Sequence, residues 1–505
     1  MDILIPKEIK NVIKKLKDKN YQAYIVGGCV RDLLRKTEPE DWDIATNAKP
    51  EEIQKIFPNS FYSNQFFTVT ILTKSPNPKL KEIEVTTFRK EAKYSDKRHP
   101  DEITFAKTLE EDLARRDFTI NAMALDISNG KSLRRSKKYN AINNQHKIRI
   151  IDLFNGKEDL KNKIIRAVGD PKERFAEDAL RMMRAVRLAV TLGEDWQIEE
   201  KTKEGIIKNA FWLKAISKER IRDEFLKIIM AKRAAEGIEM LRELGLLKTF
   251  LPELEEGYNV TQNKHHIYDC YHHALLSLKY AAERGFNQYV RLAALLHDIG
   301  KPRVKKGEGP DATFYNHEIV GAKMTFQILD RLRFPKKEIE KITKLVRYHL
   351  FYYNAGEVSE SAVRRLVRRV GPENMEELLQ VRMADRIGSG VPKAEPYKLR
   401  HLRYIIEKVS RDPISVKMLK INGYDVMRIL NIKPGPKVGQ ILDILLGKVL
   451  EDPENNRKEI LTNLVKELGN LSEAELKNLA EKARQEREKI EQKRDEMTKQ
   501  KYWVV

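Results

Sequence analysis

Apolar residues recur at two different spacings along the chain, and the change in spacing divides it into two parts. The helical period covers residues 6–20, with apolar positions at Ile9, Val12, Ile13 and Leu16. Apolar runs typical of strands follow, with helical stretches between them, at 22–26, 42–45, 67–72, 82–88 and near 120–127. From residue 158 onward the period is almost wholly helical, with interruptions at Pro and Gly. We therefore predict an α+β fold for the first 150 residues and an all-helical remainder.

Two segments are dominated by charge rather than by an apolar pattern. Residues 131–149 are basic and polar, and we expect a loop or hairpin extension that is either a solvated insertion or an RNA contact. Residues 471–500 are dense in Glu and Lys with many possible pairs four residues apart, which predicts a single, exposed, charged helix.

Composition narrows the class of protein. A chain of 505 residues is too long for one core, so several domains are expected. The formal net charge of +21 indicates a polyanionic partner, most simply a nucleic acid. The sequence has no apolar run near the roughly 18 residues of a membrane span and no signal peptide, so we expect a cytoplasmic protein with no membrane partner. The two cysteines, Cys29 and Cys270, suit a reducing compartment.

The first candidate site combines a glycine turn with a pair of carboxylates. A short apolar strand over 24–26 runs into the sequence Gly27-Gly28-x-Val30-Arg31-Asp32. The glycines let the backbone approach a phosphate closely, and the Arg31 guanidinium can fork onto phosphate oxygens. Asp41 and Asp43 are two residues apart on a strand, so both point to one face and can hold divalent metals. Either motif alone is more often an ordinary turn or strand end, but the two in this order favour phosphoryl transfer.

Two arginine-rich clusters follow. The first reads Arg115-Arg116-Asp117-Phe118-Thr119-x-Asn121-Ala122, and the second reads Glu177-Asp178-x-x-Arg181-x-x-Arg184-x-x-Arg187. Arginines three apart on a helix can line one side of it. Such a run is usually a solvated salt-bridged face. Here apolar residues alternate with the arginines, which places them at the edge of a core.

Together these motifs make the chain resemble the class II tRNA nucleotidyltransferases, the bacterial CCA-adding family within the polymerase-β superfamily. The resemblance covers roughly residues 5–250 and rests on the stretches 27–32, 41–46, 84–88, 115–122, Asp152 with Gly156, 177–181 and 216–221. A weaker likeness covers 418–450. It implies a polymerase-β-like nucleotidyltransferase head over 1–150, a helical neck over 151–255, a tRNA-binding helical tail over 391–470 and a charged terminal helix over 471–505.

The resemblance also implies an activity, which is template-independent addition of C, C and A to the 3′ end of tRNA from CTP and ATP, with no DNA partner. Asp41 and Asp43 would be catalytic and would bind Mg²⁺. The nucleotide would be bound by Gly28, Arg31, Arg116, Asp178, Arg181, Arg184 and Arg187. In this family an Asp and an Arg of one helix read the base. Asp178 can accept from the exocyclic amine of C or A, and Arg181 can donate to the ring nitrogen.

One departure bears on the extent of addition. The family usually has a glycine before the strand at 68–69, where this chain has Phe67, and we expect the strand to form because Phe suits it. The loop over 89–108 keeps the composition of the flexible loop of enzymes that add the terminal A, with Tyr94, Asp96, Arg98, His99 and Pro100. This favours full CCA addition. A CC-only, A-only or poly(A) polymerase of the same family remains the alternative.

A second centre is indicated in the helical part. Seven of the ten histidines fall between 265 and 349, and the sequence Leu296-His297-Asp298-Ile299-Gly300-Lys301 stands among them. Residues 256–390 resemble an HD-superfamily phosphohydrolase domain. The implied metal ligands are His273, His297, Asp298 and Asp385, with His317 and His349 completing a second metal or phosphate site. His273 is preferred to His272 because Ala-Leu follows it and continues the helix.

Imidazole and carboxylate ligands suit Ni, Mn, Co, Fe or Mg, and the chemistry would be hydrolysis by a metal-activated water. The alternative is a degenerate domain kept for packing or RNA binding. At the level of the whole protein, two other classes compete with nucleotide addition. One is a phosphohydrolase whose head is a regulatory nucleotide-binding domain, and the other is a pure RNA-binding protein. The filled set of carboxylates in the head argues against both.

Overall fold

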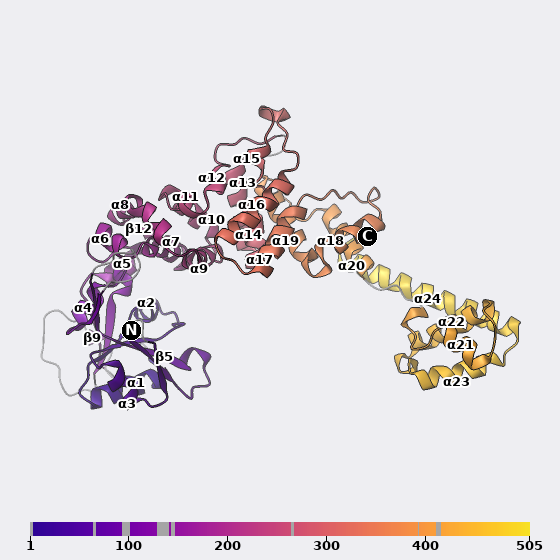
Figure 1. Ribbon diagram of the computed structural model, residues 1–505, viewed down its shortest axis with the longest axis horizontal. Coiled ribbons are helices and arrows are strands. Elements are labelled where there is room, and N and C mark those ends of the chain that lie inside the picture. The colour runs from indigo at the N-terminus through magenta and orange to yellow at the C-terminus, as the bar shows by residue number, and fades with distance from the viewer. Residues whose placement is uncertain are drawn as a thin grey trace. The chain divides into compact units, whose positions relative to one another are not determined.

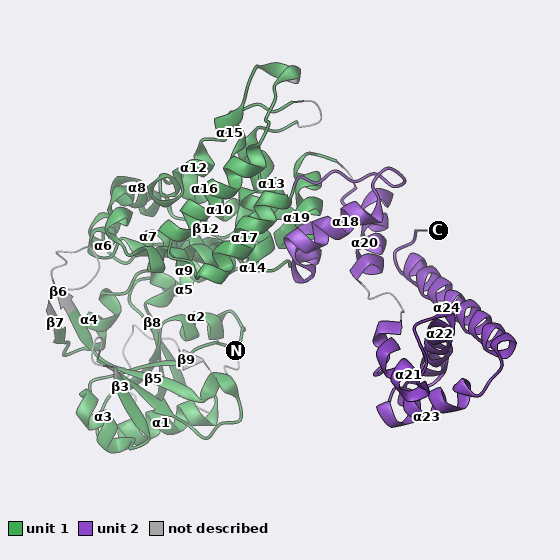
Figure 2. Cartoon of the chain, turned by 45° about the vertical axis from the view of Figure 1, so that its right-hand side comes forward, with its two compact units in different colours: residues 1–349, 380–391 green, residues 350–379, 392–505 purple. Residues whose placement is uncertain are grey.

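The computed structural model describes residues 4–63, 67–92, 102–128, 141–142, 147–263, 267–391, 393–410 and 416–504 (Figure 1). Contacts divide the chain into two compact units (Figure 2). Unit 1 contains residues 1–349 and 380–391, and unit 2 contains residues 350–379 and 392–505. Residues 350–379, which we assigned to the phosphohydrolase-like domain, therefore group with the tail.

Unit 1 begins with an eight-stranded sheet in the order β3-β4-β5-β2-β1-β8-β10-β9. Pairing is antiparallel except between β2 and β5. The strands are β1 (Ala23–Val26), β2 (Asp43–Thr46), β3 (Ser60–Ser63), β4 (Thr68–Leu72), β5 (Glu82–Thr87), β8 (Met123–Ser128), β9 (Ala141–Ile142) and β10 (Lys147–Asp152). All five predicted strands are present. The start of β10 lies inside the basic segment expected to be a loop, whose residues 131–140 and 143–146 lie outside the described structure.

Helices pack on both faces of this sheet. On one face, α1 (Lys7–Asp18) and α3 (Pro50–Ile56) bury their apolar sides against strand residues such as Ile25 and Ile44 (Figure 1). On the other, α4 (Leu109–Ala114) packs Leu109 and Leu113 against Val26. Alternate residues of β1 therefore serve two cores, as the period of two in a strand requires.

Phe67 does not extend β4. It lies just before the strand in the left-handed region with φ 54°, which costs a non-glycine residue energy. Its ring packs against Phe105 with centroids 4.5 Å apart, and its carbonyl accepts the Thr87 N–H at 3.1 Å. These two contacts hold a conformation that glycine adopts more easily. Phe105 ends a separate hairpin of β6 (Arg89–Ala92) and β7 (Glu102–Phe105). The loop residues Tyr94 to Pro100 lie outside the described residues.

A tight turn joins the head to the neck. The carboxylate of Asp152 accepts the backbone N–H groups of Gly156 at 2.8 Å and Lys157 at 2.9 Å. A Cβ on Gly156 would lie 2.1 Å from the Thr119 carbonyl oxygen, so only glycine fits.

The rest of unit 1 is helical, as predicted, apart from the short parallel pair β11 (Ile164–Ile165) and β12 (Gln197–Ile198). The neck contains α5 (Gly156–Asn162), α6 (Pro171–Glu177), α7 (Leu180–Thr191), α8 (Glu200–Asn209), α9 (Lys218–Ile229), α10 (Ala234–Glu243), α11 (Leu247–Phe250) and α12 (Pro252–Glu255). It is followed by α13 (Cys270–Glu283), α14 (Gln288–Leu296), α15 (Lys301–Val304), α16 (His317–Arg331) and α17 (Lys336–Tyr348). The helix α19 (Met375–Gly388) is divided, and its residues from 380 onward belong to unit 1.

Unit 2 contains α18 (Glu360–Val370), α20 (Tyr397–Ser410), α21 (Gly423–Leu430), α22 (Pro436–Glu451), α23 (Lys458–Gly469) and α24 (Glu473–Lys501). The charged helix α24 exists as predicted, but it is not isolated. It buries Leu476 and Ala480 in the core of the α21–α23 bundle, and Asp495 accepts a hydrogen bond from Tyr404 of α20 at 2.5 Å. Sparse apolar positions therefore sufficed to pack a helix whose sequence is mostly charged.

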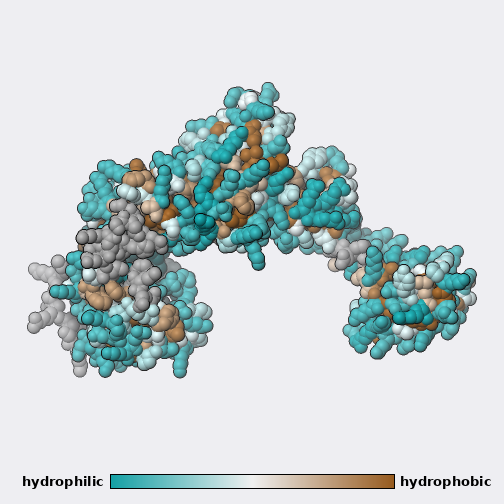
Figure 3. Space-filling model, in the orientation of Figure 1, coloured by the Kyte–Doolittle hydropathy of each residue, from teal (hydrophilic) through white to brown (hydrophobic). Residues whose placement is uncertain are grey.

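The visible surface is mostly hydrophilic, with apolar residues confined to small patches (Figure 3). Among the described residues, the helices include none with the length and apolar character needed to cross a membrane.

Candidate active site and metal centre

The glycine turn between β1 and α2 (Gly28–Leu34) brings three charged groups of the head together. Gly27 has φ 81°, and a Cβ there would lie 2.8 Å from Arg116 Nη1 and 3.2 Å from Asp43 Oδ2. Any side chain at Gly27 would therefore displace these two groups. The guanidinium of Arg31 lies over Gly28, 3.5 Å from the position a Cβ would take.

The carboxylates form a cluster at the start of β2. Asp41 precedes the strand and is exposed, Asp43 is its first residue, and Trp42 between them is buried. Burial and the negative charge of Asp41 raise the pKa of Asp43, against the opposing effect of Arg116. Glu84 pairs with Asp43 across the parallel β2–β5 register, and desolvation and the charges of Asp43 and Asp41 raise its pKa. Glu84 was not predicted as a site residue. Its position beside Asp43 depends on the strand register.

The two arginines of the head predicted to bind nucleotide are also held by carboxylates. Arg31 donates to both oxygens of Asp32, at 2.9 and 2.8 Å, and to Asn121 Oδ1 at 2.9 Å. Arg116 donates to Asp112 at 3.3 Å. Both guanidinium groups are thus oriented before any ligand arrives.

The neck residues Asp178 and Arg181 lie at the start of α7. Asp178 accepts the Leu180 N–H at 3.0 Å and an N–H of Arg220 at 3.2 Å. Arg181 is buried and donates to Glu177 at 2.6 Å and to the Arg115 carbonyl of the head at 3.3 Å. These contacts fix both side chains, and they leave the Asp178 carboxylate with lone pairs for further donors.

Arg184 and Arg187 continue along α7, and each meets a buried carboxylate. Arg184 donates to Asp117 of the head at 2.8 Å, and Arg187 pairs with Glu224 of α9 at 2.9 Å. Burial alone would raise the pKa of Asp117, but Arg184 outweighs it and lowers that pKa to about 2. The arginine run is therefore part of a paired network at the junction of head and neck, rather than a solvated face.

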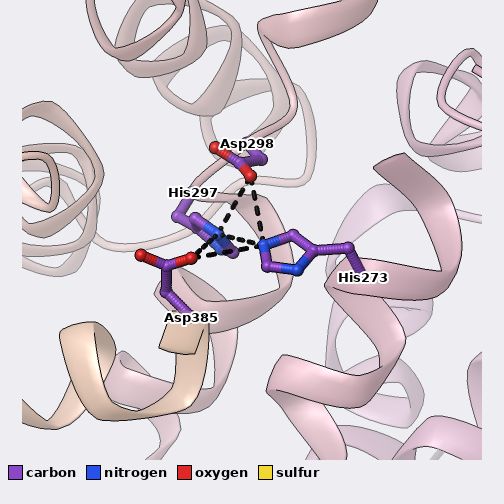
Figure 4. Close-up of side chains that lie close together, drawn as sticks. All are labelled: His273, His297, Asp298 and Asp385. Carbon is purple, nitrogen blue, oxygen red and sulfur yellow. Dashed lines mark hydrogen bonds and ion pairs between the residues drawn. The ribbon is translucent and has the colours of Figure 1, made fainter. Parts of the chain in front are cut away.

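A second cluster forms in the helical part of unit 1 (Figure 4). One ligand atom from each of His273 (α13), His297 and Asp298 (after α14) and Asp385 (α19) lies within 4.8 Å of the other three, and all four residues are buried. The Nε2 atoms of His273 and His297 are 2.9 Å apart, and Asp298 Oδ2 lies 3.1 and 3.3 Å from them. The helices therefore assemble the predicted ligand set from positions far apart in the sequence.

Three histidines are fixed in the same way, each by a hydrogen bond to a backbone carbonyl. The Nδ1 atoms of His297, His317 and His349 donate to carbonyl oxygens three residues earlier, at 2.8, 2.8 and 2.7 Å. In the neutral rings, Nε2 then carries a lone pair that points into the cluster. Burial lowers the pKa of His297, but the neighbouring carboxylates of Asp298 and Asp385 outweigh it and raise that pKa to about 10.

A second group of ligands shares Asp298. Its Oδ1 lies 3.3 Å from His317 Nε2 and 3.6 Å from His349 Nε2. The buried His317 Nε2 makes no hydrogen bond, so it is an available metal ligand. Lys301 donates to Asp298 Oδ2 and to Gln262 Oε1, both at 2.6 Å. This buried ammonium was not predicted as part of the site.

The neighbouring histidines are outside this cluster. His272 Nδ1 contacts Asp269 at 2.8 Å near the start of α13, whereas His273 points into the ligand set. His265 and His266 lie outside the described residues. Buried imidazole and carboxylate ligands of this kind fit a divalent transition metal.

The chain matches three protein-family models. Residues 23–166 match the poly A polymerase head domain, residues 195–257 match the probable RNA and SrmB-binding site of polymerase A, and residues 267–389 match the HD domain.

Proteins named CCA-adding enzyme align with most of the chain. The one from Geobacillus sp. (strain WCH70) is 33% identical over 89% of this chain and 93% of its own length. The one from Enterococcus faecalis is 33% identical over 92% of this chain and 97% of its own length. The protein from Lactobacillus helveticus is 44% identical over 46% of this chain, and that match spans 53% of the relative, about half its length.

A solved structure has a similar fold. The crystal structure of the Bacillus stearothermophilus CCA-adding enzyme in complex with CTP superposes with a TM-score of 0.57 at 28% identity. The superposition covers 92% of this chain and 98% of that one.

Proposed function

The chain belongs to the CCA-adding enzyme family and is a nucleotidyltransferase, and from this premise we propose that it adds C, C and A to the 3′ end of tRNA in the cytoplasm. The observation that carries the proposal is the packing of Asp43 and Arg116 around Gly27. A carboxylate and a guanidinium at one glycine turn provide both a metal ligand and a phosphate ligand.

Asp41 and Asp43 would hold Mg²⁺, with Glu84 beside them. These residues suit Mg²⁺ because this ion prefers hard ligands such as carboxylate oxygens. Burial, followed by the charges of neighbouring carboxylates, raises the pKa of Asp43 and of Glu84, and a bound cation would oppose both effects. When bound, Mg²⁺ would supply neutralisation of the phosphate charge.

The chain's own residues position the reactants. Arg31 and Arg116 would bind the triphosphate of CTP or ATP beside the glycine turn. The 3′ hydroxyl of tRNA attacks the α-phosphate, the bond to the β-phosphate breaks, and pyrophosphate leaves. Holding the two reactants in line supplies much of the rate enhancement in such a transfer.

Base selection is assigned to α7. Asp178 would accept from the exocyclic amine of C or A, and Arg181 would donate to the adjacent ring nitrogen. Arg220 holds the Asp178 carboxylate, and Glu177 holds Arg181, so neither group can rotate to suit uracil or guanine. Each mismatch should cost on the order of 1–3 kcal/mol. Arg184 and Arg187 would complete this side of the nucleotide site.

One experiment separates full addition from partial addition. Three tRNA transcripts that end before CCA, after C and after CC are each incubated with the protein, Mg²⁺ and a single nucleotide. We expect CTP to extend the first two and ATP to extend the third, with no growth beyond CCA. Failure to add A would identify a CC-adding enzyme, and repeated A addition would identify a poly(A) polymerase.

A second candidate function is favoured by the buried histidine cluster. We propose that His273, His297, Asp298 and Asp385 hold a divalent metal, Ni, Mn, Co or Fe, and that His317 and His349 form a second metal or phosphate subsite. The backbone-fixed Nε2 lone pairs support this assignment. A bound metal would supply an activated water for phosphoester hydrolysis. Metal-stripped protein should regain hydrolysis of a 2′,3′-cyclic phosphate or a terminal phosphate with one of these ions. Inactivity with all of them, together with no metal in the purified protein, would favour a structural role.

A further inference from the structure

Arg35, the residue that ends α2, reaches across to the far end of the base-selecting helix α7. Its guanidinium donates to the carbonyl of Leu192, the C-cap residue of α7, and lies over the Trp196 ring at 5.9 Å from the ring centre. The same guanidinium donates to Asp32 at 3.4 Å. Carbonyls at a helix C-terminus lack helical partners and carry partial negative charge, so a guanidinium stabilises this end.

From Arg35 the contacts continue back to α7 through the head. Asp32 accepts two hydrogen bonds from Arg31, and Arg31 donates to Asn121. Asn121 in turn donates to Asp117 at 3.2 Å, and Asp117 accepts from Arg184 at 2.8 Å. The side chains therefore form a closed circuit that leaves α7 at Leu192 and returns to it at Arg184.

Two residues of the circuit belong to the proposed nucleotide site: Arg31 would bind phosphate, and Arg184 lies on the base-selecting helix. In the described structure, the Arg35 side chain contacts Asp32, Leu192 and Trp196 and makes no hydrogen bond or ion pair with Asp41 or Asp43. Its contacts instead fix the C-terminal end of α7 against α2. The apolar residues of α7, which include Met182, Met183 and Val186, are buried without its help, so the helix does not need Arg35 to fold.

We propose that Arg35 is a positioning residue for nucleotide addition, which keeps the phosphate-binding turn and the base-selecting helix in one fixed relation. This inference rests on the proposed function of the head. Without the Arg35 contacts, the hydrogen bond of this described circuit that still holds α7 is the one from Arg184 to Asp117. The triphosphate and the base would then be bound less well together, and a wrong base would be rejected less strongly.

The test compares Arg35→Met, which keeps the side-chain length, with Arg35→Lys and with Lys36→Met as the matched control. Lys36 is the exposed neighbour and carries the same charge. On a tRNA transcript that ends before CCA, we measure kcat and KM for CTP and the ratio of CTP to UTP incorporation. Equilibrium dialysis gives the affinity for CTP.

For Arg35→Met we expect KM for CTP to rise and the CTP-to-UTP ratio to fall, each by about fivefold, the size of losing one charge at a helix terminus. We expect kcat within about twofold of wild type, an unchanged melting temperature, partial recovery in Arg35→Lys and wild-type behaviour in Lys36→Met. An unchanged KM and base ratio in Arg35→Met would overturn the inference. A lowered melting temperature that accounts for the loss of activity would also overturn it, because the effect would then come from unfolding. If the wild type adds no nucleotide, the proposed function fails. CTP affinity then decides the inference separately, because equal affinity in Arg35→Met and wild type overturns it.

Discussion

Asp117 of the head accepts a hydrogen bond from Arg184 of the neck at 2.8 Å, and the carboxylate is buried while the guanidinium side chain is half-buried. This ion pair joins the part of the chain that holds the proposed catalytic carboxylates to the helix that would read the base. Its pH dependence follows from the low pKa of Asp117, about 2 against an ordinary value of 3.8.

We predict that Asp117→Asn lowers the free energy of unfolding at pH 7 by on the order of 1–2 kcal/mol, because it removes the charge-assisted hydrogen bond of the half-buried Arg184. A folded-state pKa below the unfolded value stabilises the fold above about pH 4, and that contribution is lost as pH falls toward 2. Urea unfolding at several pH values should therefore show the mutant and wild type converging as pH falls below about 4. A difference that stays constant down to pH 3 would refute the ion-pair account.

The contacts of α7 predict a specific change in base choice. Asp178→Ala and Arg181→Ala should slow addition and also let UTP and GTP compete better with CTP and ATP, because the groups that reject the wrong bases are gone. Competition assays with mixed nucleotides measure this directly. Glu173→Ala, a change at an exposed position on the preceding helix, serves as the control. Full discrimination in both mutants would place base reading elsewhere.

The positive charge predicts a steep salt dependence of tRNA binding. A net charge of +21 implies several phosphate contacts, so the logarithm of the association constant should fall linearly with the logarithm of salt concentration. Filter binding between about 50 and 200 mM salt is sufficient. A flat plot would show that the basic excess serves another purpose.

The two centres should be separable. The ligands of the histidine cluster lie on α13, α16 and α19 or directly after α14 and α17, whereas the carboxylates of the head lie at the neighbouring central strands β2 and β5 of the sheet. We predict that His297→Ala and Asp298→Asn abolish metal-dependent hydrolysis but keep CCA addition within about tenfold, roughly 1.4 kcal/mol. His272→Ala, next to the cluster but outside it, should keep both activities. Loss of addition in a folded His297 or Asp298 mutant would show that the centres are coupled.

Periodicity predicted much of the fold, because a single buried face repeats clearly in sequence. Ile9, Val12, Ile13 and Leu16 marked α1, and all five predicted strands formed. Strand β10 was not predicted because its start lies inside the basic segment 131–149, and its pairing with β8 depends on residues that precede that segment. The left-handed conformation of Phe67 was also missed, because a ring contact with Phe105 and a hydrogen bond from Thr87 stabilise it.

The candidate site residues were predicted from residue type and spacing, but the side chains that they contact were not. The sequence indicated an arginine run on α7. Only the tertiary structure shows that Arg184 meets Asp117 and that Arg187 meets Glu224. Glu84 lies beside Asp43 because of a strand register, and Lys301 reaches Asp298 because a short helix follows it. Long-range pairings of this kind depend on how elements pack, which local patterns do not encode.

The most direct test of the account is addition by Asp41→Ala and Asp43→Ala on a tRNA transcript that ends before CCA. Wild-type protein with CTP, ATP and Mg²⁺ should extend it by three nucleotides. Each mutant should add none, because losing a metal ligand removes several kcal/mol of transition-state stabilisation. Both mutants should still bind tRNA with nearly wild-type affinity. Near-wild-type addition by either mutant would contradict the assignment of the active site.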